Sequence, residues 1–170
     1  EADDIIATIC KECHDCPIMI VSSDKDFQQL QVYRGVTQWS PTKKVLLKCK
    51  DPVSFLKEHT LRGDTSDGVP NFLSADDCFV TDGKRQKPIS TKKLETWMKH
   101  DPEDFCNDIQ LSYLDRNRRM VDFAYIPKDI QDQVMERFLA EIDREADRGK
   151  IFPYMVRHRL THLLSCIQEF

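Results

Sequence analysis

Hydrophobic residues follow different patterns in the first fifty positions and in the rest of the chain. Residues 5–13 carry apolar side chains at helical spacing after an acidic start, and residues 17–21 form a continuous apolar run. A run of that length predicts a strand buried on both faces of a parallel sheet. Residues 36–39 and 45–47 predict two more short strands, joined as a hairpin-like edge. The first fifty residues therefore indicate part of an α/β core.

From residue 51 onward the spacing indicates helices. Asp51-Pro52 and Asp101-Pro102 each place an acidic N-cap before a proline suited to the first helical position. We expect these two helices to run to about Leu61 and about Ile109. Apolar residues at helical spacing predict further helices in residues 90–98, 130–142 and 156–167.

Length and composition agree with one domain, or one domain with a small helical lobe. The chain has 170 residues, of which 40% are hydrophobic. No apolar run approaches the roughly 20 residues of a membrane span, and no signal peptide is visible. These features predict a cytoplasmic protein, in the cytoplasm of a bacterial host if the protein is viral. The expected fold class is α/β, with a partial parallel-sheet core in residues 1–50 and a mainly helical region in residues 51–170.

Acidic residues form three clusters at places where a metal ligand could stand free of regular hydrogen bonding. Glu1 and Asp3 open the first predicted helix. Asp24 and Asp26 follow the predicted strand two residues apart, so in an extended chain both point into the crevice beyond the carboxyl ends of the strands. Asp67 lies in a Gly-Asp loop. Each cluster alone is also what helix capping and turns require, but the three together indicate a metal site.

Several carboxylates in one pocket repel one another and are stable together only with cations between them. Oxygen ligands without thiolate or imidazole favour Mg²⁺ or Mn²⁺ over zinc. Two such ions could activate a water and stabilise the leaving oxygen of a phosphoryl displacement. The pattern therefore predicts a two-metal phosphodiesterase site. Lys25 is interpreted as a solvated neighbour of these acids rather than as an electrostatic helper.

The sequence around these acids resembles consecutive motifs of the flap-endonuclease family of 5′-nucleases, and the resemblance extends over nearly the whole chain. It rests on the motifs Glu1-Ala2-Asp3-Asp4, Ser22-Ser23-Asp24-Lys25-Asp26-Phe27, Gln38-Trp39-Ser40-Pro41, Gly63-Asp64-Thr65-Ser66-Asp67-Gly68-Val69-Pro70, Asp122-Phe123-Ala124-Tyr125-Ile126-Pro127, Arg148-Gly149-Lys150-Ile151 and Glu169-Phe170.

This resemblance implies a site, a fold and a reaction. It implies catalytic roles for Asp24, Asp26 and Asp67, and two Mg²⁺ ions, replaceable by Mn²⁺, on the carboxylates of Glu1, Asp3, Asp24, Asp26, Asp64 and Asp67. It implies a PIN-like 5′-nuclease core, and a helix-three-turn-helix element, opened by residues 63–70, that grips the duplex backbone. The implied activity is 5′ to 3′ exonuclease or flap-endonuclease cleavage of an RNA–DNA hybrid or duplex DNA, which removes RNA primers during DNA replication. A replication clamp and a single-strand-binding protein are implied partners.

Three features depart from the family pattern. Gly68 stands where members usually carry Asn, and residues 71–74 stand where most have a glycine-rich hairpin that holds phosphate. The chain also begins at the third acidic motif of the family. We therefore interpret it as the carboxyl-terminal portion of a longer nuclease, and expect this portion alone to bind metal weakly and to be inactive.

The net charge of −4 fits a nucleic-acid binder only because the charges are segregated. The acids include the predicted metal site, and the bases occur in short runs. Such runs are often only solvated surface, but those nearest the 63–70 loop are suited to phosphate contact. The predicted DNA-binding residues are Lys84, Arg85, Lys87, Lys92 and Lys93.

The cysteines also raise the question of a metal or haem site. Seven scattered cysteines suit reduced, buried thiols better than a disulfide framework. Cys10-Lys11-Glu12-Cys13-His14 matches a c-type haem attachment pattern, and Cys16 could add a zinc ligand. Cys10 and Cys13 fall on the apolar stripe of the first predicted helix, so we predict core packing instead.

Two other classes of protein share some of these features. A receiver-like phosphotransfer domain also gathers carboxylates around one Mg²⁺, but it needs five alternating strands and helices, which the helical second part does not offer. A non-catalytic DNA-binding module could keep the nuclease fold and use only its basic surface. Mutation of the acidic residues separates the second alternative from a nuclease.

Overall fold

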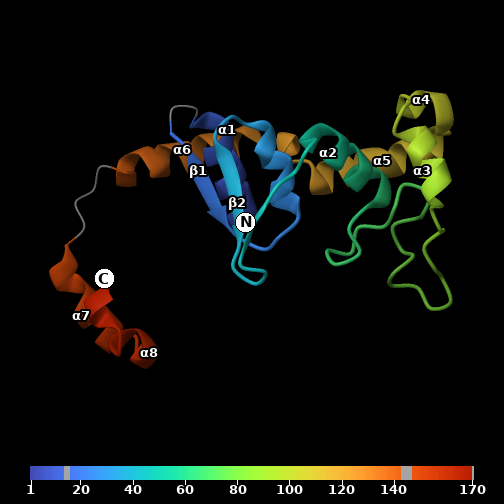
Figure 1. The fold of residues 1–170 in the computed structure, drawn as a ribbon. Helices are drawn as coiled ribbons and strands as arrows, with labels where there is room; N and C mark the ends of the chain where they lie inside the picture. Colours follow the sequence, from blue (N-terminus) through green and yellow to red (C-terminus); the bar gives the residue numbers. More distant parts are fainter. Residues whose placement is uncertain (14–15, 143–146, 170) are drawn as a thin grey trace. The chain divides into compact units, whose positions relative to one another are not determined.

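The computed structural model describes residues 1–13, 16–142 and 147–169, and its contacts divide the chain into two compact units, Glu1–Met135 and Glu136–Phe170. The first unit holds the sheet and all of the predicted site residues (Figure 1). The predicted boundary at residue 50, between an α/β core and a helical DNA-binding region, lies within this unit. The division of roles between these two regions stays a prediction. None of the described helices combines the length and apolarity needed to cross a bilayer.

Three strands form a small mixed sheet: β1 (Ile18–Val21), β2 (Val36–Ser40) and β3 (Val45–Leu47), in the order β1-β2-β3. β1 and β2 are parallel, with Ile18 opposite Val36, and β2 and β3 are antiparallel. The predicted hairpin is therefore confirmed. The α/β class is also confirmed, but the parallel part of the sheet consists of a single pair of strands.

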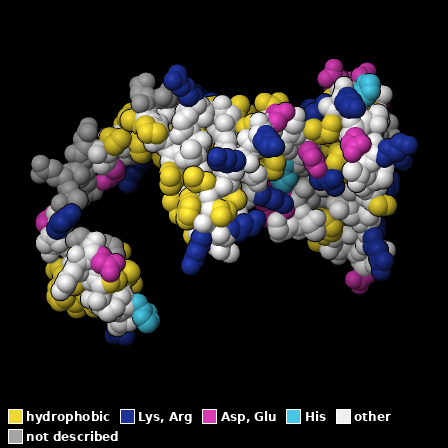
Figure 2. All heavy atoms as spheres, in the orientation of Figure 1, with side chains coloured by type: hydrophobic (Ala, Val, Ile, Leu, Met, Phe, Trp, Pro, Cys, Tyr) yellow, Lys and Arg dark blue, Asp and Glu magenta, His cyan; other side chains and the backbone are white. Residues whose placement is uncertain are grey.

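Only one face of this sheet is covered in the described structure. Helix α1 (Ala2–Glu12) and the 3₁₀ helix η1 (Asp26–Val32) pack against it, in a core of Ala7, Cys10, Ile20, Phe27, Leu30 and Val36. On the other face Met19 and Val21 are 58% and 65% exposed. Hydrophobic side chains gather over this part of the surface (Figure 2). The prediction that residues 17–21 are buried on both faces is wrong, because β1 alternates between a covered and an open face.

The helical part of the first unit begins with α2 (Pro52–Arg62), as predicted. Asp51 caps it by accepting a hydrogen bond from the backbone nitrogen of Ser54, at 3.0 Å. It is followed by α3 (Thr91–Trp97), α4 (Pro102–Phe105) and α5 (Asp108–Val121). The second core joins these helices through Leu61, Phe72, Leu94 and Leu114, with the rings of Trp97 and Phe105 against Phe72.

Two helix predictions need correction. The helix expected to run from Pro102 to about Ile109 ends at Phe105, because Asn107 caps a new helix, α5. Asn107 accepts from the Gln110 backbone nitrogen, and the Gln110 side chain accepts in return from the Asn107 nitrogen, which makes a capping box.

In the carboxyl-terminal region, too, a helix predicted as continuous is divided into shorter ones. α6 (Lys128–Ile142) covers the helix predicted over residues 130–142. The single helix expected over residues 156–167 is instead α7 (Ile151–Arg157), α8 (Thr161–Leu164) and the 3₁₀ turn η4 (Ile167–Glu169). Arg159 has a φ of 54°, which cannot continue a right-handed helix. Two other 3₁₀ turns complete the chain, η2 (Phe123–Tyr125) and η3 (Arg148–Lys150).

A segment of consecutive turns joins α2 to α3. Arg116, from α5, holds this segment: its guanidinium donates to the carbonyl oxygens of Pro70 at 2.8 Å and Ser74 at 3.2 Å, and pairs with Asp76. Arg116 belongs to a basic run in the sequence, but here it fixes a loop. The helix-three-turn-helix element stays a prediction. The observed order of α2, a segment of turns and α3 is compatible with it.

Candidate metal centre

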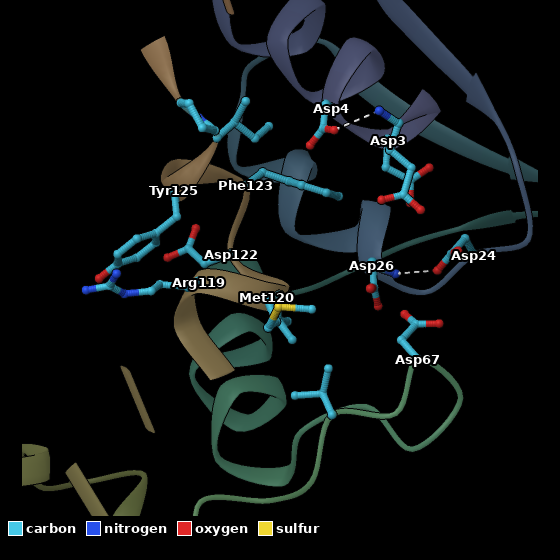
Figure 3. Close-up of a pocket in the computed structure, with 15 residues that line it drawn as sticks. Asp3, Asp4, Asp24, Asp26, Asp67, Arg119, Met120, Asp122, Phe123 and Tyr125 are labelled. Carbon is cyan, nitrogen blue, oxygen red and sulfur yellow. Dashed lines mark hydrogen bonds and ion pairs between the residues drawn. The ribbon is translucent and has the colours of Figure 1, made fainter. Parts of the chain in front are cut away.

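A pocket of about 540 Å³ gathers carboxylates from all three acidic clusters. Figure 3 shows Asp3, Asp24, Asp26 and Asp67 turned toward one another at one side of it. The acids that line the pocket are Glu1, Asp3, Asp4, Asp24, Asp26, Asp67 and Asp122. The fold thus brings together five of the six predicted metal ligands, although they are separated by up to 66 positions in sequence, from Glu1 to Asp67.

Local hydrogen bonds set the positions of the two central aspartates. Asp24 follows β1, and its backbone nitrogen donates to the Ser22 hydroxyl oxygen at 3.1 Å. Asp26 is the first residue of η1, and its backbone nitrogen donates to the Asp24 carboxylate at 3.0 Å. The buried Gln38 of β2 donates to the carbonyl oxygens of Ser22 and Asp24. The prediction that the chain is extended here is therefore wrong, because it enters a 3₁₀ helix at Asp26. Both carboxylates nevertheless line the pocket.

The pocket carries negative charge that its neighbours do not neutralise. Burial raises the pKa of Asp3, and the carboxylates of Asp24, Glu1 and Asp26 raise it further. Burial also raises the pKa of Asp67, together with Asp64, Asp26 and Asp24, and the opposing effect of Lys25 is smaller. Mutual repulsion within a set of oxygen donors is what a hard divalent cation relieves, so these residues fit Mg²⁺ or Mn²⁺.

A divalent cation should therefore stabilise the fold. Because the folded-state pKa values of Asp3 and Asp67 are raised, these two groups reduce stability in chelator as the pH rises from about 3.9 through the raised values. We expect Mg²⁺ at about 100 times its dissociation constant to raise the midpoint of thermal unfolding at neutral pH by roughly 5 to 10 °C. Asp67→Asn should unfold in chelator at the same or a higher temperature and lose most of the Mg²⁺ effect. A midpoint that ignores Mg²⁺ in both proteins would contradict the assignment.

Asp64 does not line this pocket. Its side chain is 2% exposed, and its carboxylate accepts from the Ser66 backbone nitrogen at 2.9 Å and from the Ser66 hydroxyl, and pairs with Lys25 at 2.9 Å. Burial raises the pKa of Asp64, but the hydrogen bonds from Ser66 and Lys25 outweigh it and leave the pKa below its usual value. Lys25 is therefore the counter-ion of a buried acid, although its own side chain is 49% exposed, and the interpretation of Lys25 as only a solvated neighbour needs this correction.

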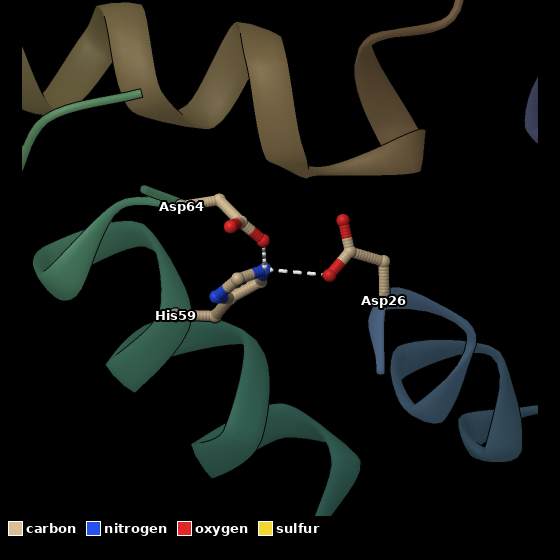
Figure 4. Close-up of side chains that lie close together, drawn as sticks. All are labelled: Asp26, His59 and Asp64. Carbon is tan, nitrogen blue, oxygen red and sulfur yellow. Dashed lines mark hydrogen bonds and ion pairs between the residues drawn. The ribbon is translucent and has the colours of Figure 1, made fainter. Parts of the chain in front are cut away.

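His59 is the residue of this site that the sequence did not reveal. It lies on α2, is 7% exposed, and its Nε2 is 2.8 Å from the Asp26 carboxylate and 3.6 Å from that of Asp64 (Figure 4). The one signal in the sequence was its spacing of four from Phe55, which puts both rings on one side of α2. That signal predicts burial, but no pattern within α2 indicates a partner in η1.

The opposite wall of the pocket comes from the end of α5 and the segment after it. Arg119, Met120 and Tyr125 lie there, across from the acids in Figure 3. Met120 and Tyr125 are exposed apolar side chains, and Arg119 pairs with Asp115 of its own helix at 2.8 Å. The pocket therefore combines a side formed by the three acidic clusters with a side that carries apolar residues, Arg119 and the carboxylate of Asp122.

The predicted DNA-binding residues are all exposed, in or next to the start of α3. Lys84 is paired with Asp77, and Lys87 lines a second hollow, of about 370 Å³, together with Lys25 and Arg62. Lys92 and Lys93 lie in the first turn of α3. The structure thus leaves all five accessible to a partner, and their role stays a prediction.

The prediction of buried cysteines holds for Cys10 and Cys78, whereas Cys16 is exposed and the other four are partly buried. Cys10 is buried against the sheet, and burial raises the pKa of its thiol to about 11, which disfavours the thiolate that a metal needs. The described cysteines are free. His14, the last residue of the haem-like pattern, lies outside the described residues.

Comparison with known proteins defines the class to which this fold and pocket belong. A sequence model of the family described as "T4 RNase H, C terminal" matches residues 54–170. "Ribonuclease H" of Enterobacteria phage T4 is 32% identical over 179 residues, an alignment that covers all of this chain and 58% of that protein. These matches show the family of this chain. It belongs to the T4 RNase H family, and it spans 58% of the length of this curated relative.

Proposed function

We propose that this chain supplies the metal-binding and DNA-gripping parts of a Mg²⁺-dependent 5′-nuclease. The substrate class we propose is a 5′ end or flap on an RNA–DNA hybrid or duplex DNA, as in removal of RNA primers during replication. The observation that carries the proposal is the pocket in which carboxylates from three separate segments meet and in which the pKa values of Asp3 and Asp67 are raised. Kinship with a ribonuclease H supports it.

Each acid has a proposed role in this reaction. Glu1, Asp3, Asp24, Asp26 and Asp67 would hold two Mg²⁺ ions, for which Mn²⁺ can substitute. The ions, when bound, supply Lewis-acid stabilisation of the charge that develops on the phosphate. Asp24, Asp26 and Asp67 would be the catalytic members of this set of ligands.

Asp64 takes a different part in the proposal from the one its motif implied. Its carboxylate is already bound by Ser66 and Lys25, and it lies outside the pocket lining. We therefore propose that Asp64 stabilises the loop beside the site through Ser66 and Lys25. The alternative is that Asp64 coordinates a metal ion directly, and a structure with bound ions would distinguish the two roles. The PIN-like core, a replication clamp and a single-strand-binding protein remain predictions.

Substrate contacts follow from the other wall and from the basic residues. Met120 and Tyr125 offer exposed apolar surface beside the acids, against which a nucleotide could pack. Lys84, Arg85, Lys87, Lys92 and Lys93 would contact phosphates farther along the duplex. This arrangement separates the reacting phosphate from the groups that position the helix.

Loss of two of these cations should weaken duplex binding regardless of sequence. We expect Lys92→Gln with Lys93→Gln to lower affinity in chelator several-fold and to flatten the plot of log affinity against log salt by about one to two units. Lys48→Gln with Lys50→Gln removes the same charge from exposed positions outside the proposed interface and should change neither. Fluorescence anisotropy at several salt concentrations measures both quantities. Equal effects of the two pairs would show that only net charge matters.

The activity itself is tested on 5′-labelled RNA–DNA hybrid and 5′-flap duplex, with Mg²⁺ and with chelator, for the natural protein that carries this chain. Short 5′ products that require the metal would support the nuclease. Duplex binding without cleavage would favour a non-catalytic DNA-binding module. The described strands, three in a mixed sheet, give no support to a receiver-like domain.

A further inference from the structure

We propose that His59 is a positioning residue, which fixes the Asp26 carboxylate for metal binding through a hydrogen bond from Nε2. The proposal rests on the proposed function, because it takes Asp26 to be a metal ligand. It goes beyond the acidic motifs, since it assigns a role to a side chain on a different element that does not line the pocket.

The direction of the hydrogen bond follows from the two partners. An ionised carboxylate can only accept, so the short contact of 2.8 Å between His59 Nε2 and Asp26 Oδ1 requires the histidine to donate. Asp64 is farther from the same nitrogen, at 3.6 Å. The imidazole hydrogen therefore belongs to Asp26.

Asp64 and Lys25 explain why this hydrogen is free to bond to Asp26. The Asp64 carboxylate already accepts two hydrogen bonds from Ser66 and pairs with the Lys25 ammonium at 2.9 Å. Its need for donors is met without His59. Both carboxylates face the same Nε2 atom of His59, and that of Asp26 is the closer, at 2.8 Å against 3.6 Å for Asp64 (Figure 4).

The histidine itself has little freedom to move. It is 7% exposed, and its ring packs on Phe55 with 5.6 Å between ring centroids. A buried donor of this kind restricts the carboxylate to one orientation before any ion arrives. Residues that orient metal ligands in this way affect metal affinity or activity by about 10-fold to 100-fold when they are replaced.

The three ligand atoms of Asp26, His59 and Asp64 lie within 4.8 Å of one another, which would also permit a metal ion to bind all three directly. The two roles differ in what can replace the imidazole. A positioning histidine needs only an N–H at the right reach, which the amide of glutamine provides. A ligating histidine supplies a nitrogen lone pair, which the amide nitrogen of glutamine lacks, so glutamine could ligate only by turning its carbonyl oxygen to the ion and giving up the N–H donor at that place.

The test compares His59→Phe, which keeps a ring on Phe55 without a donor, with His59→Gln, which restores an N–H donor. Phe55→Leu is the matched control, because it removes the ring contact and leaves the hydrogen bond. Asp26→Asn tests the proposed function separately. All are made in the natural protein that carries this chain, and the Mn²⁺ dissociation constant is measured by titration calorimetry, beside thermal unfolding in chelator and the Mg²⁺ concentration for half-maximal activity.

We expect His59→Phe to weaken Mn²⁺ binding by about 10-fold or more, and His59→Gln and Phe55→Leu to stay within about 3-fold of the unmodified protein. An unchanged dissociation constant in a folded His59→Phe protein would overturn the proposal. So would equal weakening by His59→Gln, which would instead indicate direct ligation. If Asp26→Asn binds Mn²⁺ normally, the proposed metal site fails; if it binds poorly while His59→Phe binds normally, only the role of His59 fails.

A second measurement needs no substitution at His59, and covers the case in which His59→Phe does not fold. In protein labelled with ¹⁵N at histidine, the Nε2–H of His59 should give a slowly exchanging proton signal in chelator, which moves when Mg²⁺ is added. The movement should be absent in Asp26→Asn. A rapidly exchanging or Mg²⁺-insensitive signal in the unmodified protein would overturn the proposal.

Discussion

In the natural protein that carries this chain, Asp24→Asn combined with Asp26→Asn is expected to lower hydrolysis of a 5′-labelled hybrid by at least about 1000-fold in Mg²⁺, since it removes two carboxylates that line the pocket. Duplex affinity in chelator should stay within about 3-fold, because the substitutions leave the proposed phosphate contacts in place. The local backbone should also survive, since an asparagine side-chain oxygen can still accept the hydrogen bond that Asp24 accepts from the Asp26 nitrogen.

Two comparisons make this result specific. Asp82→Asn combined with Asp104→Asn removes two exposed acids outside the pocket, and should leave cleavage within about 3-fold. Equal loss of cleavage and of binding in the Asp24 and Asp26 variant would count against the roles assigned to these residues. It would show that the acids support the fold or the interface and not the reaction.

Gly63→Ala is expected to have the largest effect on stability among single substitutions near the site. Gly63 ends α2 with φ 67° and ψ −172°, a conformation that is essentially restricted to glycine. A Cβ there would lie 2.4 Å from the Val69 carbonyl oxygen and 2.5 Å from that of Pro70. Backbone strain and this overlap together should cost roughly 3 kcal/mol or more, measured by denaturant unfolding.

The same substitution should also weaken metal binding, because Gly63 opens the loop that carries Asp64 and Asp67. Gly68→Asn is the matched control within that loop. Gly68 has φ 73°, a Cβ added there would meet no other atom within 4 Å, and asparagine tolerates this left-handed region. We expect it to cost no more than about 1 kcal/mol. If Gly63→Ala costs as little as Gly68→Asn, the close approach of the loop to α2 is not as described.

This conformation also explains one departure of the sequence from the family pattern. Asparagine and glycine are the two residues that most readily adopt a positive φ, so the exchange at position 68 keeps the same turn. Asp67, immediately before it, still lines the pocket. The departure therefore leaves the predicted ligand in place.

Local signals predicted those parts of the fold that local interactions determine. Asp51 before Pro52 marked the start of α2, and the hydrogen bond to Ser54 is its physical cause. The same reasoning predicted the start of α4 at Pro102 but not its end at Phe105, because the capping box at Asn107 and Gln110, which starts a new helix, was overlooked. The alternation of β1 was also missed, because a short apolar run does not show which of its faces will be covered.

The site could be predicted as far as its acidic motifs extend. Asp24 and Asp26 were placed at the pocket by their position after a strand, even though the chain between them enters a 3₁₀ helix. His59 and Lys25 could not be placed, because their roles depend on how α2 and the loop after it pack against η1. No spacing within either segment encodes that contact.

The central claim is that the acidic pocket holds divalent metal ions, and it is tested most directly by locating those ions. Crystals of the natural protein that carries this chain, soaked in Mn²⁺, would be measured at a wavelength where manganese scatters anomalously. We predict two manganese peaks among the carboxylates of Asp3, Asp24, Asp26 and Asp67, and none in the Asp24 and Asp26 variant. Manganese bound only elsewhere, or a pocket in which these carboxylates remain without an ion, would contradict the account.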